Sequence, residues 1–77
     1  MILNKKIIVE AKTIVDEKPV MGFRALIETT NPNEVTMLPW QINKELCKEY
    51  REIVREDQKE FEDYVYKLQE EVVANNL

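Results

Sequence analysis

The sequence has no histidine and only one cysteine, Cys47, which excludes several ways of stabilising a small protein or of building a reactive site. One cysteine cannot form a disulfide within the chain, and without histidine a single chain cannot build a Cys/His zinc site. No catalytic or nucleotide-binding motif is present. We therefore expect no cofactor, no metal and no enzymatic activity.

The sequence also lacks an excess of positive charge and a long apolar run. Its net charge of −4 disfavours direct binding to nucleic acid or to an anionic membrane surface. The apolar run behind Lys5 and Lys6, residues 7–9, ends at Glu10, whereas a secretory signal needs about 7–15 apolar residues and a membrane span about 20. We expect a cytoplasmic protein, in a host cell, or one associated with a virion.

The chain is short, at 77 residues, and we expect a single domain over 1–77. A core of this size supplies only about 3–5 kcal/mol, and small chains compensate by disulfides, metals, regular helix packing or self-association. Since the first two are excluded, regular packing and self-association remain.

Two alternating segments near the N-terminus predict a β-hairpin over residues 5–30. In the first, the odd positions from Ile7 to Val15 form one apolar or small-residue face, and in the second Met21, Phe23 and Ile27 do the same. The polar run 16–19 provides the turn. Both apolar sets share a face only if odd positions oppose odd positions.

Residues 31–39 contain two prolines and predict a loop, and residues 40–74 contain neither glycine nor proline and predict a long helix. Thr36 and Asn43 are the alternative N-caps. The fold class is therefore α+β, a ββα chain. A helix of that length spans roughly 50 Å, and a ten-residue strand only about 33 Å, so the hairpin would leave the apolar stretch from Phe61 to Val72 uncovered.

An apolar stripe flanked by a basic and an acidic stripe runs along the predicted helix, a pattern typical of a solvated helix or of one that pairs with another helix. We expect the stripe to mediate a homodimer or a higher bundle, with a helix bent near Asp57 and Gln58 as the monomeric alternative. The predicted interface residues are Tyr50, Val54, Asp57, Phe61, Tyr64, Val65, Leu68 and Val72.

Asp57 lies within the apolar stripe, where an unpaired buried carboxylate would be very costly. It marks an opening to water at the end of the hairpin, a pairing with a cation or tyrosine hydroxyl of a second chain, or, least in keeping with its neighbours, a catalytic group. Trp40 either closes the open end of the core or is an exposed anchor. Cys47 is expected in the core.

A resemblance adds an origin to this interpretation. The succession MGFRALIETTNPNEVTMLPWQINKELCKEYREIVREDQKEFEDYVY, with Thr29-Thr30-Asn31-Pro32 after a strand pair and the charged run Asp57 to Asp63 in the helix, resembles small proteins encoded by phages and prophages of Gram-positive bacteria. It covers about residues 20–66. The resemblance implies a phage or prophage origin, often beside tail and lysis genes, and carries no activity.

The sequence thus predicts a non-enzymatic structural or assembly protein that acts through a self-associating amphipathic helix and contacts itself or another phage or host protein. The alternative is a small acidic inhibitor of a host enzyme, such as one that processes nucleic acid. Mimicry of DNA phosphates is disfavoured because six cations share the helix with its acids.

Overall fold

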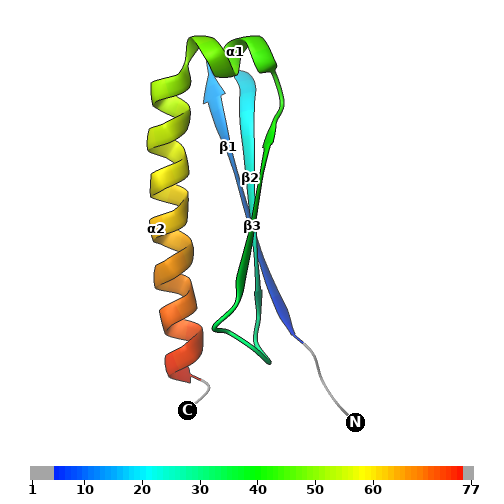
Figure 1. Cartoon of the computed structure of the whole chain (residues 1–77), viewed down its shortest axis with the longest axis vertical. Helices are drawn as coiled ribbons and strands as arrows, with labels where there is room; N and C mark the ends of the chain where they lie inside the picture. The colour runs from blue at the N-terminus through cyan, green and yellow to red at the C-terminus, as the bar shows by residue number, and fades with distance from the viewer. Residues whose placement is uncertain (1–4, 76–77) are drawn as a thin grey trace.

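The computed structural model describes residues 5–75, and it is an α+β fold in which three strands precede the helical part (Figure 1). The predicted domain of 1–77 also includes residues 1–4 and 76–77, which lie outside the described residues. The elements are β1 (Lys6–Val15), β2 (Lys18–Glu28), β3 (Val35–Gln41), α1 (Lys44–Glu49) and α2 (Arg51–Asn75). The sheet is antiparallel with the order β1-β2-β3, so β1 and β3 are its edges.

The predicted hairpin is confirmed, together with its register. Ile7 lies opposite Ile27 and Ala11 opposite Phe23, so odd positions face odd positions. The two-residue turn consists of Asp16 and Glu17, with φ of 51° and 66°. Positive φ at both central residues is the geometry of a type I′ turn, whose twist matches that of the strands it joins.

A β-bulge at Val20 ties the sheet to the helical part. The register shifts where Thr13 faces Met21 and Ile14 faces Pro19, which leaves Val20 as the extra residue. Its side chain is fully buried, and its carbonyl oxygen accepts the backbone N–H of Ile42 at 3.0 Å and of Asn43 at 3.1 Å. The Cys47 thiol donates to the same oxygen at 3.1 Å. This one carbonyl therefore positions the end of β3 and the start of α1.

The predicted loop over 31–39 is wrong in its second half, because Val35–Gln41 forms β3. Val35 and Met37 face the helix beside Ile27 and Ala25, while Thr36 and Leu38 face outward. Pro39 signalled the start of a helix in the sequence. A proline is also tolerated in an edge strand, where its missing N–H breaks no ladder bond.

The predicted helix over 40–74 begins later and is divided. Of the two predicted caps, Asn43 is the one that forms, since its side-chain oxygen accepts the N–H of Leu46 at 3.1 Å. Thr36 lies in β3. The helix changes direction at Tyr50 (φ −108°, ψ 37°), and α2 then continues through Asp57 and Gln58 without the bend considered there.

The sheet covers the helix along its length, which corrects the prediction of an uncovered stretch from Phe61 to Val72 (Figure 1). A helix of 25 residues is about 37 Å long and a strand of 11 residues about 36 Å, so α2 and β2 match. Phe61 and Val65 are buried, and Leu68 and Val72 pack against the same core. The fully or nearly buried core residues are Val20, Phe23, Ala25, Ile27, Cys47, Val54, Phe61 and Val65.

A candidate interaction surface beside β1

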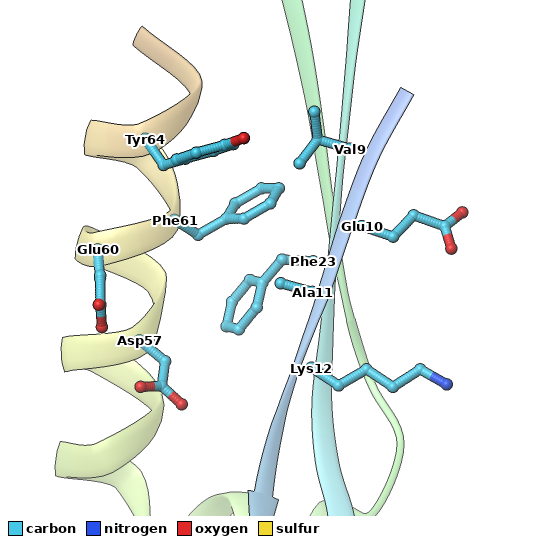
Figure 2. Close-up of a pocket in the computed structure, with 9 residues that line it drawn as sticks. All are labelled: Val9, Glu10, Ala11, Lys12, Phe23, Asp57, Glu60, Phe61 and Tyr64. Carbon is cyan, nitrogen blue, oxygen red and sulfur yellow. The ribbon is translucent and has the colours of Figure 1, made fainter. Parts of the chain in front are cut away.

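An open groove of about 500 Å³ lies between β1 and α2 (Figure 2). Its floor is apolar, and the rings of Phe23 and Phe61 stack there with centroids 5.6 Å apart. Tyr64 lies along the helix wall and is 57% exposed. The wall of the strand is formed by Val9, Glu10, Ala11 and Lys12.

The helix α2 lies over β1 and β2, the two strands that it mainly contacts, and the groove opens between α2 and β1. Val9 and Ala11 face the helix but are only half-buried, which reflects this incomplete cover. In Figure 2 the side chains of Glu10 and Lys12 point away from the helix. The groove is therefore bordered by the backbone of β1 on one side and by one flank of α2 on the other.

Asp57 has a partner within its own chain. Its Oδ2 accepts a hydrogen bond of 2.8 Å from the hydroxyl of Thr13, a fully buried residue of β1. Its other side borders the groove, where the carboxylate is partly exposed. The partial exposure of Asp57 agrees with an opening to water, but the cover by the hairpin does not end there, since Val54 and Phe61 on either side are both buried. The internal hydrogen bond was not predicted.

Replacing Asp57 by leucine is expected to destabilise the protein by about 1–3 kcal/mol, because the Thr13 hydroxyl would lose its partner inside the protein. The result reverses the simple expectation that an apolar residue in an apolar stripe raises the melting temperature. The double variant Asp57→Leu, Thr13→Val removes both polar groups and should recover most of the loss. Urea denaturation of the wild type and of both variants measures the difference, and a stabilised single variant would contradict it.

The predicted interface residues fall into two groups. Val54, Phe61 and Val65 are buried under the sheet of their own chain, Leu68 and Val72 pack against the same core, and Tyr50 is half-buried at the junction of the helices. Only Asp57 and Tyr64 combine a place on the groove with exposure to solvent. The apolar stripe thus faces mainly the sheet, and the part of it that a second chain can reach is the flank beside β1.

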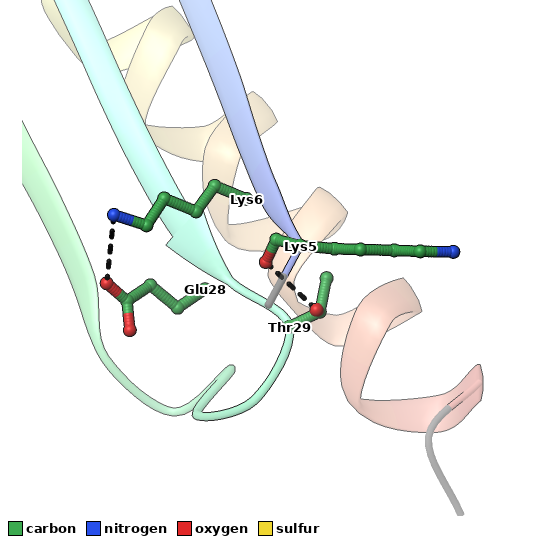
Figure 3. Close-up of polar contacts among 4 residues, drawn as sticks. All are labelled: Lys5, Lys6, Glu28 and Thr29. Atoms are coloured by element: carbon green, nitrogen blue, oxygen red, sulfur yellow. Dashed lines mark hydrogen bonds and ion pairs between the residues drawn. The ribbon is translucent and has the colours of Figure 1, made fainter. Parts of the chain in front are cut away.

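The outer face of the sheet, opposite α2, carries a second set of exposed apolar residues. Ile8, Leu38 and Trp40 are 51%, 55% and 40% exposed. Two ion pairs on this face join β1 to β2. They are Lys6 with Glu28 at 3.8 Å and Arg24 with Glu10 at 3.3 Å. Figure 3 shows the first, next to the hydrogen bond of 2.9 Å from the Thr29 hydroxyl to the Lys5 carbonyl oxygen.

Cys47 and Trp40, both singled out in the sequence, lie in different parts of the fold. Cys47 is buried in the core, as predicted. Trp40 lies on the outer face instead of closing the end of the core, and its indole covers the Cα of Gly22, its neighbour on β2. This contact depends on the register of β2 and β3, which pairs Gly22 with Trp40.

Residues 5–75 contain no group of three or more Asp, Glu, Cys or His side chains arranged to hold a metal ion. No helix in the same range is long and apolar enough to cross a membrane. Comparisons with protein-family models, with curated proteins and with solved structures found no match to the chain.

Proposed function

We propose that this chain is a non-enzymatic structural or assembly protein, of the phage or prophage type that its sequence resembles, and that it acts by self-association. The observation that supports the proposal is the open groove beside β1. The exposed ring of Tyr64 lies there next to the β1 edge of the sheet, in a chain whose small core gains from an additional partner. The site of action would be the host cytoplasm or the virion.

The groove favours binding over catalysis. Its polar groups from the helix are Asp57, which is engaged by Thr13, together with Glu60 and the hydroxyl of Tyr64. A general acid or base needs a second group placed to act on the same substrate atom. Asp57 is instead occupied by a structural hydrogen bond, while the exposed ring of Tyr64 offers contact area.

Size-exclusion chromatography with light scattering at tens of micromolar tests the proposal. We expect a mass of twice 9.2 kDa for the wild-type chain. Tyr64→Ala should weaken the association, because Tyr64 borders the groove and is 57% exposed. Tyr66→Ala is the matched control, since Tyr66 is similarly exposed, at 51%, but lies about 180° away from Asp57 around the helix. A monomeric wild type would contradict the proposal.

The second candidate function is the acidic inhibitor of a host enzyme. It is favoured by the charge distribution, because α1 and α2 carry the whole net charge of −4 while the remainder of the chain is balanced. An inhibitor would remain monomeric alone and form a stoichiometric complex with one host enzyme in affinity capture. A dimer that captures only itself or phage proteins would favour the assembly role.

A further inference from the structure

The two edges of the sheet differ in their capacity to accept another strand. β3 is seven residues long and contains Pro39, which has no N–H to donate. β1 is ten residues long without proline or glycine, and the extra residue of the bulge lies on β2. A long, regular edge strand presents a row of backbone donors and acceptors to another strand. Of the two edges, β1 is the one suited to extending the sheet.

The outward-facing backbone groups of β1 belong to its even-numbered residues. The N–H of Thr29 donates to the carbonyl oxygen of Lys5 at 3.0 Å, so the main chain of Lys5 points toward β2. Because this direction alternates along an antiparallel ladder, the N–H and C=O groups of Glu10 and Lys12 point away from β2. These are the residues whose backbone borders the open groove. The donors and acceptors are therefore accessible.

We infer that a second copy of the chain adds to this edge, β1 against β1 in antiparallel orientation, about a two-fold axis at Ala11. The inference rests on the proposed self-association and gives it a geometry. Ala11 then lies opposite Ala11 of the second copy. The pairs on either side are Glu10 with Lys12, Val9 with Thr13, Ile8 with Ile14 and Ile7 with Val15.

This register is selected by charge and by apolar exposure. Opposite charges in directly facing positions stabilise a strand pair, and like charges destabilise it. The pairing also buries Ile8 and Ile14, which are 51% and 60% exposed, against each other. The neighbouring registers that preserve the two faces of the sheet place Glu10 opposite itself or Lys12 opposite itself. The strand is thus complementary to its own copy in one register.

The helices fit the same arrangement. A two-fold axis perpendicular to the sheet places both copies of α2 on one face. The two-fold axis lies midway between the two β1 strands, and α2 lies over β1 and β2. With a strand spacing of about 4.8 Å, the axis of α2 is therefore about 5 Å from the two-fold axis. The two helices would then be about 10 Å apart, within the range of packed helices. The second α2 would close the groove and cover Tyr64, with Asp57 on the same flank.

Disulfide trapping tests the axis directly. In this register Ala11 faces its copy in a pair without hydrogen bonds, where Cα atoms are about 4.5 Å apart, a distance that a disulfide can span. In a full-length Cys47→Ala background, Ala11→Cys should form a covalent dimer under mild oxidation on a non-reducing gel. Leu38→Cys, on the outer face of the sheet, should remain monomeric. Trapping through position 38 alone would place the interface on the outer face and overturn the inference.

A charge exchange tests the register without cysteines. Lys12→Glu places a glutamate opposite Glu10 of the other copy in both symmetry-related pairs. This repulsion should raise the dimer Kd about tenfold. Adding Glu10→Lys restores opposite signs and should recover the affinity. Lys59→Glu, an equal charge change at an exposed position on the far side of α2, should have little effect.

The outcomes separate this inference from the proposed function. A wild-type dimer that is neither trapped through position 11 nor rescued by the charge exchange overturns the β1 arrangement and leaves self-association intact. A wild-type monomer at tens of micromolar overturns self-association itself. Trapping at position 11 together with rescue supports both, and circular dichroism of each variant verifies that the fold is retained.

Discussion

Replacing Phe61 by alanine is expected to lower the free energy of unfolding by about 3–5 kcal/mol, the usual cost of deleting a buried aromatic side chain. Phe61 is only 8% exposed, and its ring stacks on that of Phe23 across the helix–sheet interface. A domain of this size has little more than that amount of stability in total. The variant should therefore be largely unfolded at room temperature, as measured by urea denaturation followed with far-UV circular dichroism.

Tyr64→Ala is the matched comparison, three residues along the same helix. Because Tyr64 is 57% exposed, its removal should change the stability of the isolated chain by less than about 1 kcal/mol. Urea denaturation at two protein concentrations separates an effect on folding from an effect on association. A loss of association appears only as a change in how the apparent stability depends on protein concentration. A Phe61→Ala variant that stays folded but no longer associates would show that Phe61 belongs to an interface between chains.

The hairpin was predictable because period-two alternation and a shared apolar face determine both strand and register. β3 was not, although Val35 and Met37 alternate with Thr36 and Leu38. Pro39 outweighed that pattern, since proline fits the first turn of a helix as well as an edge strand. Only the pairing of β3 with residues 21–27 of β2 distinguishes an edge strand from the first turn of a helix here. Such pairing depends on contacts between residues that are distant in sequence.

The helix shows a similar division. The apolar stripe was recovered from its periodicity, but a helical wheel does not identify which surface covers the stripe. The third strand and the change of direction at Tyr50 allow the sheet to cover Val54, Phe61 and Val65. Asp57 was recognised as unusual, whereas its partner Thr13 lies 44 residues away and carries no local signal. Long-range contacts therefore account for both omissions.

Gly22→Val is expected to destabilise the protein by about 3 kcal/mol, although valine is among the best strand formers. The gain from β-propensity is at most about 1 kcal/mol. A Cβ at position 22 would overlap Cε2 and Cζ2 of the Trp40 indole, so the ring must move away. Trp40 is 40% exposed, and moving it exposes roughly 100–150 Å² of covered surface, worth about 3 kcal/mol at 25 cal/mol per Å². Steric exclusion outweighs propensity.

A double-mutant cycle isolates this contact. In a Trp40→Ala background the space above position 22 is open, and Gly22→Val should then stabilise the strand by up to about 1 kcal/mol. The sign of the glycine substitution thus depends on Trp40. In the single variant, the emission of the only tryptophan should shift to longer wavelength as the indole enters water. If Gly22→Val were equally destabilising with and without Trp40, the cost would lie in the backbone of β2, and the glycine would be required for a reason other than the ring that covers it.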